Sequence, residues 1–123
     1  MHRCILVAAA VTLSVPSAHA EWGWMRGGPA ADFTEADWNL LKTEARRVLD
    51  EVDSGVRVNW KNPDTGAHGA IKALMTFEHD AQTCRRVAFL NISPKGRRGQ
   101  GNYNLCQQPD GEWKFIADSE ISS

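Results

Sequence analysis

The spacing of apolar residues changes at Gly55, and this change constrains the fold more than any other feature of the sequence. From Trp38 to Val52, apolar side chains recur every three or four residues, which is the spacing of one helix face. From Val56 to Lys61 they alternate with polar residues, as in a strand with one buried face. The sequence therefore predicts one amphipathic helix followed by strands.

Both ends of the predicted helix carry recognisable signals. Thr34 is a favourable N-cap, and Asp37 stands where the acidic partner of a capping box belongs. Phe33 and Trp38 occupy the two positions of a hydrophobic staple. Gly55 is suited to the left-handed conformation that follows many helices. We expect a helix that begins after Thr34 and continues to the residues just before Gly55.

Short apolar segments follow, separated by segments rich in Gly, Pro, Asn and Asp. The expected strands are Val56–Lys61, Ala70–Phe77, Thr83–Ile92, Asn102–Gln107 and Glu112–Ala117. The polar segment Glu78–Ala81 and the Gly-rich segment from Ser93 to Gly101 are interpreted as loops. Four or five short strands joined by turns predict an α+β fold, in which an antiparallel meander has one face covered by the helix.

The first twenty residues have the pattern of a secretory signal peptide. A basic start is followed by an 11-residue apolar run from Ile5 to Val15, and then by small residues at Ala18 and Ala20. A permanent membrane anchor is the alternative. The run is short for an anchor, because a spanning helix needs about 20 residues. We expect cleavage after Ala20 and export of residues 21–123.

We expect the exported chain to contain a single domain over residues 32–118, followed by a frayed tail over 119–123. Residues 21–31 contain Gly and Pro without helical or strand periodicity, and they are interpreted as a flexible or loosely docked leader. Trp22 and Trp24 lie in this leader. Their side chains either anchor a partner or lipid surface, or fold back and pack against the domain.

Charge and cysteine content limit the class of protein. The 123 residues contain 14 Lys and Arg against 15 Asp and Glu, a net charge of −1 that does not favour nucleic-acid binding. Signal cleavage removes Cys4 and leaves Cys84 and Cys106, which we expect to form a disulfide in an oxidising compartment. If Ser93–Gly96 closes the hairpin between them, one bulge in the Gly-rich arm brings the two cysteines opposite each other.

Groups with catalytic or metal-binding chemistry are scarce. His68 and His79 have no ligand at the close spacing typical of a metal site, so a site that uses both is the least favoured hypothesis. The disulfide leaves no thiolate nucleophile, and no serine lies in a nucleophile-elbow pattern. The glycines from Gly96 to Gly101 precede a strand and lack the ending of a phosphate loop. We therefore expect neither an enzyme nor a cofactor nor a metal.

Basic residues cluster in or beside one predicted hairpin, and they are the candidate contacts for a ligand or partner. The cluster consists of Arg85, Arg86, Lys95, Arg97 and Arg98. Such a cluster can attract a phosphorylated glycolipid, a polyanionic polymer or an acidic partner. The alternative is a charged loop and sheet edge that discourage aggregation.

Two segments also carry a family resemblance. They are Trp60–Gly66 (WKNPDTG) and Cys106–Lys114 (CQQPDGEWK), with Gly69 and Cys84-Arg85 between them. The chain from Val56 to Ile116 resembles the C-terminal domain of the seventeen-kilodalton surface antigen family of Gram-negative envelopes. The resemblance implies a small β-rich envelope domain with cysteines at these positions and no catalytic residues. Family members often carry a lipid-acceptor cysteine and a glycine-zipper segment. We see neither before the domain, so we do not carry membrane anchoring over.

Two functional hypotheses follow from the sequence. The first is an exported, non-enzymatic and monomeric protein of the periplasm or cell surface that binds an envelope protein, glycolipid or polymer. The second is a secreted inhibitor that presents the basic loop over residues 95–101 to the acidic cleft of an envelope-acting enzyme.

Overall fold

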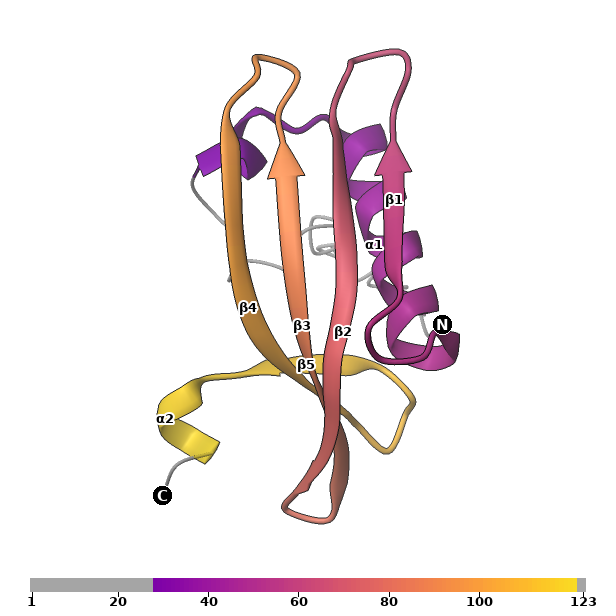
Figure 1. Ribbon diagram of the computed structural model, residues 1–123, viewed down its shortest axis with the longest axis vertical. Coiled ribbons are helices and arrows are strands. Elements are labelled where there is room, and N and C mark those ends of the chain that lie inside the picture. Colours follow the sequence, from indigo (N-terminus) through magenta and orange to yellow (C-terminus); the bar gives the residue numbers. More distant parts are fainter. Residues whose placement is uncertain (1–27, 122–123) are drawn as a thin grey trace, which may run out of the picture.

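The computed structural model describes residues 28–121, and Figure 1 shows a helix behind a five-stranded sheet. Two small helical elements stand at the ends of this region. The elements in chain order are η2 (Gly28–Asp32), α1 (Glu35–Glu51), β1 (Arg57–Lys61), β2 (His68–His79), β3 (Gln82–Ile92), β4 (Arg98–Gln107), β5 (Trp113–Ile116) and α2 (Asp118–Ile121).

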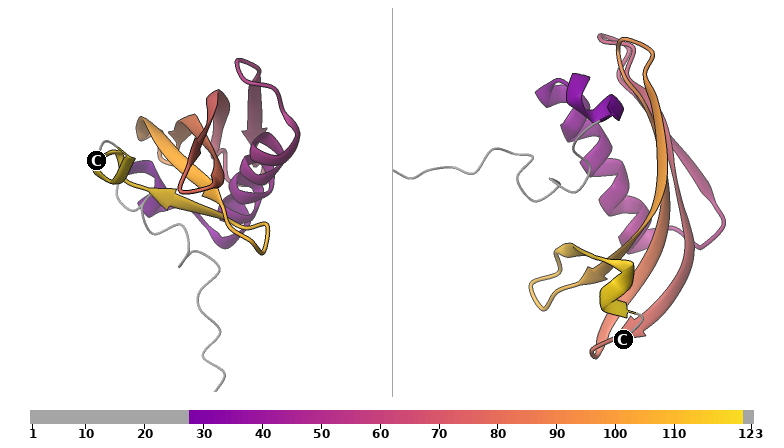
Figure 2. Two further views of the ribbon diagram at one scale, coloured as in Figure 1. Left: turned by 90° about the horizontal axis from the view of Figure 1, so that it is seen from below. Right: turned by 90° about the vertical axis from the view of Figure 1, so that its left-hand side faces the viewer.

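The sheet is an antiparallel meander in the order β1-β2-β3-β4-β5, so each strand pairs with its neighbours in sequence. It curves around α1, and β5 folds toward the helix (Figure 2, right). The predicted α+β architecture, one main helix packed on an antiparallel meander, is confirmed. The sheet therefore has a concave face covered by α1 and a convex face that we call the outer face.

The helix begins as the sequence predicts. The Thr34 side chain accepts a hydrogen bond from the Asp37 N–H at 3.2 Å, and the Asp37 carboxylate accepts one from the Thr34 N–H at 2.9 Å. Phe33 and Trp38 form the staple, with ring centroids 5.7 Å apart. The end differs from the prediction: α1 stops at Glu51, and Gly55, with φ of 90°, lies beyond the cap and donates its N–H to Ala73.

Two strands are longer than predicted. β2 continues through His79, so Glu78 and His79 belong to a strand and only Asp80 and Ala81 form the turn. Both turn residues have positive φ, 49° and 62°, as two-residue hairpins require. β4 begins at Arg98, so the predicted loop ends well before Gly101. Neither of these additional strand segments shows apolar alternation. The side chains at the end of β2 lie beyond the part of the sheet that α1 covers, and the start of β4 contains glycines.

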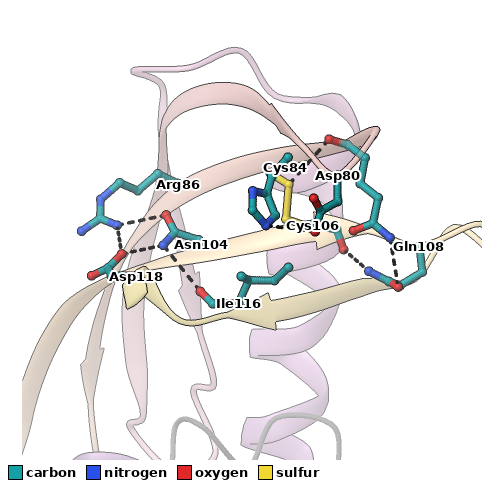
Figure 3. The surroundings of a disulfide bond; sticks show 10 residues. Asp80, Cys84, Arg86, Asn104, Cys106, Gln108, Ile116 and Asp118 are labelled. Carbon is teal, nitrogen blue, oxygen red and sulfur yellow. Dashed lines mark hydrogen bonds and ion pairs between the residues drawn. A yellow bond between two sulfur atoms is a disulfide. The ribbon is translucent and has the colours of Figure 1, made fainter. Parts of the chain in front are cut away.

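The disulfide joins Cys84 of β3 to Cys106 of β4, as predicted (Figure 3). The expected bulge is absent from this hairpin. Ile92 pairs with Arg98, and the register continues unbroken until Cys84 faces Cys106. The connecting loop is one residue longer than the sequence suggested, and this extra residue sets the register. The irregularity in the neighbouring pairing of β2 with β3 lies at Leu74.

The structure also differs from the prediction at both ends of the domain. The last part of the expected leader, residues 28–31, lies in the short helix η2, in which Pro29 and Ala30 are buried. Pro29 packs so closely on β4 that a Cβ on Gly99 would lie 2.8 Å from its ring. At the other end, where fraying was expected, Asp118–Ile121 forms a helical turn.

The core lies between α1 and the concave face, and aromatic rings join its parts. The ring centroids of Phe33 and Trp60 of β1 are 5.5 Å apart. The ring centroid of Tyr103 in β4 lies 5.9 Å from that of Phe89 and 6.2 Å from that of Phe115. The buried aliphatic side chains between them include Leu41, Val48, Leu49, Ile71, Val87 and Leu105. Because this core occupies only one face, the outer face carries mainly polar and small residues, with Leu90 and Ile92 among them.

A buried carboxylate connects the start of α1 to the β1–β2 turn. The Asp37 side chain is fully buried and accepts hydrogen bonds from Asn62 at 2.8 Å and from the Thr65 hydroxyl at 2.7 Å. Burial alone raises the pKa of the Asp37 carboxyl, but the hydrogen bonds from Thr65, Thr34 and Asn62 outweigh it, and its pKa lies below the ordinary value. The WKNPDTG segment therefore supplies two donors to the helix start.

We expect Asp37→Asn to lower the free energy of unfolding by about 2 kcal/mol at neutral pH, because buried donors lose their charged acceptor. A carboxyl whose pKa is lowered by folding stabilises the protein above about pH 4, and this contribution is lost as the pH falls through the folded pKa. Urea unfolding between neutral pH and pH 2 should therefore give a flatter pH dependence for Asp37→Asn than for the wild type. Asp64→Asn, an exposed change in the same turn, is the control. Parallel pH curves for Asp37→Asn and wild type would contradict the account.

Candidate functional site: the outer face of the sheet

The outer face carries the alternate residues of each strand. Trp60, Ile71, Val87 and Leu105 point into the core, so their neighbours in sequence point outward. The strand register then places outward residues in rows across the sheet. One row is Arg57, Lys72, Ala88 and Asn102, and the next is Asn59, Ala70, Leu90 and Gln100. A third row is Lys61, His68, Ile92 and Arg98.

These rows contain cations but no carboxylate. Arg57, Lys61, Lys72 and Arg98 are all exposed, and none of the outward strand positions in β1 to β5 is Asp or Glu. Within residues 28–121, these four side chains form no ion pair. The Arg57 side chain donates to Asn59 at 3.1 Å, which holds it along its own strand. These three rows are thus positively charged without internal neutralisation.

A first hollow of about 470 Å³ lies at the centre of the face. Its floor is low because Ala70 and Ala88 occupy central positions in adjacent rows and have no side chain beyond Cβ. Longer side chains surround this floor. The rim is formed by Arg57, Lys72, Leu90, Arg98, Gln100 and Asn102.

A second hollow of about 550 Å³ adjoins the first along β1 and β2. Arg57, Leu90 and Arg98 line both hollows, so the two form one continuous depression. Lys61 and His68 add further polar groups, and the His68 ring nitrogen lies 2.9 Å from the Gly66 carbonyl oxygen. Leu90 and Ile92, both partly exposed, form an apolar strip between the cations.

This arrangement is suited to binding an anion. Arginine presents a planar fork that matches phosphate and carboxylate oxygens, and lysine adds a compact charge. The side-chain amides of Gln100 and Asn102 can donate or accept hydrogen bonds at the same rim. The outer face of the sheet, defined by these two hollows, is therefore our candidate site.

Arg85, one of the five predicted contacts, is directed to the opposite face. It is 7% exposed and donates to the carbonyls of Val48 at 2.6 Å and Leu49 at 3.2 Å. It also donates to the hydroxyls of Thr76 at 3.1 Å and Ser54 at 3.2 Å. Arg85 therefore supports the C-terminal end of α1 and does not line the outer-face hollows.

Three other predicted contacts lie near carboxylates. Arg86 donates to Asn104 at 3.0 Å and to Asp118 at 2.9 Å (Figure 3). Hydrogen bonds from Asn104 and Arg86, and the charge of Arg86, lower the pKa of the Asp118 carboxyl. Lys95 and Arg97 lie 3.8 and 3.5 Å from the Asp32 carboxylate of η2.

Of the predicted cluster, only Arg98 lines the outer-face hollows. Trp22 and Trp24 lie outside the described residues. The two histidines stand at opposite ends of β2, about 35 Å apart along an extended strand. Among residues 28–121, no three His, Cys, Asp or Glu side chains are grouped so that they could hold a metal ion.

Sequence reasoning missed Arg57, Lys61 and Lys72. The alternation from Val56 to Lys61 already placed Arg57 and Lys61 on the polar face of their strand, and this was the available signal. The predicted cluster instead contained basic residues that are close in sequence, between positions 85 and 98. Adjacent residues in a strand point to opposite faces, so closeness in sequence does not place them on one surface.

None of the helices within residues 28–121 combines the length and the apolar character that crossing a membrane requires.

The comparisons with known proteins agree with the earlier resemblance. The family described as 17 kDa outer membrane surface antigen matches residues 47–114. The 17 kDa surface antigen of Rickettsia prowazekii (strain Madrid E) is 37% identical over 84 residues, which are 67% of this chain and 52% of the relative. That of Rickettsia japonica is 33% identical over 88 residues, 70% of this chain and 54% of the relative. The chain thus spans about half the length of the curated relatives that it matches. No solved structure matches it.

Proposed function

Because the chain belongs to the family of 17 kDa outer membrane surface antigens, we propose that it is an exported envelope protein that binds an anionic envelope component through the outer face of its sheet. The observation that carries the proposal is the ring of Arg57, Lys72 and Arg98 around a hollow with an alanine floor. Exposed positive charge without an acidic partner among the described residues favours a negatively charged ligand.

Export is supported by two features of the chain. Residues 1–20 have the pattern of a cleavable signal, and a cross-strand disulfide is stable in an oxidising compartment. The relatives are described as surface antigens. We therefore propose a location in the periplasm or at the cell surface, and we propose that the protein acts as a monomer.

A binding role without catalysis is part of the same proposal. The description of the family refers to an antigen and not to a reaction. The near balance of acidic and basic residues also disfavours a nucleic-acid-binding protein. The alternative of an inhibitor acting through the loop over residues 95–101 has less support, because Lys95 and Arg97 already face Asp32.

Crosslinking in the producing cells tests the proposed face. A photoreactive amino acid is placed at Asn102, on the rim of the first hollow, and as a matched control at Arg47, on the exposed face of α1. We expect a light-dependent adduct with an envelope component from position 102 and none of the same mass from position 47. Identical adducts from both positions, or none from position 102, would contradict the proposal.

A further inference from the structure

We infer that the component is a phosphate-bearing lipid, with its headgroup in the first hollow and its apolar part along Leu90 and Ile92. This inference rests on the proposed function and names the ligand class of the same face. It follows from three properties of the depression: the identity of its cations, the apolar surface between them, and its shape.

The cations favour a phosphate group. Arg57, Lys72 and Arg98 all line one hollow of about 470 Å³, so an anion inside it lies among three cationic side chains. Arg57 and Lys72 are direct cross-strand neighbours, whereas Arg98 comes from β4 on the far side of β3. Two guanidinium forks and one ammonium group suit the several oxygens of a phosphate better than a single carboxylate. Gln100 and Asn102 add amide donors for headgroup oxygens.

The apolar surface favours a lipid over a soluble polyanion. A polyanion is held by charge alone and gains little from contact with hydrocarbon. Here Ala70, Ala88 and Leu90 line the same hollow as the cations, and Ile92 continues the apolar strip into the second hollow. An amphiphile can satisfy both parts together, because its charged end meets the rim while its hydrocarbon covers the strip.

The size and shape of the face allow this arrangement. The two hollows, about 470 and 550 Å³, lie in the range of sites for small ligands. They share Arg57, Leu90 and Arg98, so one ligand can extend from one hollow into the other. The face is convex, with α1 and β5 on its other side (Figure 2, right), so neither element blocks approach to a lipid surface.

Vesicle flotation of the purified, exported protein tests the inference. The probes are phosphatidylcholine vesicles with and without a minority of phosphatidylglycerol. We expect binding only to the anionic vesicles, with a loss of about fivefold for each of Lys72→Ala and Arg98→Ala, since one cation near an anionic surface contributes about 1 kcal/mol. The double variant Lys72→Glu/Arg98→Glu should lose at least about 25-fold.

Two further variants separate a built site from general attraction. Lys114→Glu makes the same charge change on the same face of the sheet, but in β5 and away from both hollows. We expect it to change binding less than twofold. Leu90→Thr keeps every charge and shortens the apolar strip, and we expect about a fivefold loss. Circular dichroism of each variant shows whether the fold is retained.

The outcomes distinguish this inference from the proposed function. If anionic vesicles do not bind while the Asn102 crosslink to a polymer or protein persists, the lipid inference is overturned and the proposed function stands. A loss in Lys114→Glu as large as the loss in Lys72→Ala would overturn the assignment to the hollow. If Leu90→Thr binds anionic vesicles as well as the wild type does, and dextran sulfate displaces the protein from the vesicles, the ligand is a polyanion and not a lipid. If the Asn102 crosslink is also absent, both proposals fail.

Discussion

Replacement of Arg85 by methionine is expected to lower the free energy of unfolding by about 3 kcal/mol. The protein has a nearly balanced charge, so the effect comes from the lost contacts and not from the change in net charge. The last carbonyls of a helix have no partner within it, and the last turn of α1 contains no basic residue. Arg85 supplies both the donors and the charge, through its bonds to Val48 and Leu49. Methionine fills similar volume but removes these donors, so that the Leu49 carbonyl loses its Arg85 partner and the Val48 carbonyl keeps only the Val52 N–H.

Arg86→Met is the matched control for this prediction, because the next residue along β3 points to the outer face and its side chain is 31% exposed. Its ion pair with Asp118 is exposed to solvent, so we expect a loss below about 1 kcal/mol. Urea unfolding of both variants gives the comparison. Equal losses would show that Arg85 does not support the helix end.

Gly69→Ala is the second change for which we expect a large effect, a loss of about 3 kcal/mol. A Cβ at this position would collide with the Leu90 carbonyl oxygen on β3 and would lie 2.6 Å from the Trp60 indole nitrogen. The backbone of β3 cannot move aside without breaking its pairing, and Trp60 is fixed against Phe33. We therefore expect a lower midpoint of thermal unfolding and altered Trp fluorescence.

Gly101→Ala provides the comparison for Gly69→Ala, because it introduces the same methyl group into another strand of the sheet. There the nearest atom is the Tyr103 hydroxyl, 2.8 Å from the added Cβ, and it belongs to a partly buried side chain and not to the backbone of a paired strand. We expect a loss below about 1 kcal/mol. Similar losses for both variants would mean that close packing at Gly69 is not the cause.

Much of the fold could be predicted because local signals and burial agree. Thr34, Asp37 and Trp38 mark the start of α1 through contacts that lie within one helical turn. The disulfide could be predicted from cysteine count and compartment alone. Its register could not, because one additional residue in the loop before Arg98 changes which residues face each other, and no local pattern determines the loop length.

The first part of β4 could not be predicted as a strand, because its sequence lacks the alternation of apolar and polar residues. Its inward positions include Gly99 and Gly101, so the strand shows no apolar alternation there. The space above these glycines is filled by Pro29 and by the Tyr103 ring. Tyr103 belongs to the same strand, whereas Pro29 comes from η2 and only the tertiary structure brings it to β4.

The candidate site could be predicted only in part. Arg85 lies in phase with Val87 and Phe89, so its inward direction was readable, yet its partners at the end of α1 were not. The outer-face depression depends on cross-strand neighbours, since Lys72 and Arg57 meet through the register of β1 and β2. The low floor at Ala88 becomes a hollow only because long side chains from other strands surround it.

The central claim is that the outer face of the sheet binds an anionic envelope component. Nuclear magnetic resonance of the labelled, exported protein, titrated with soluble short-chain phosphatidylglycerol, tests this claim residue by residue. The account predicts saturable shifts of the amides of Lys72, Ala88 and Asn102, with Arg47 of α1 and Lys95 unchanged. Shifts centred on Lys95 and Arg97, or on α1, with the row from Lys72 to Asn102 unaffected, would contradict it.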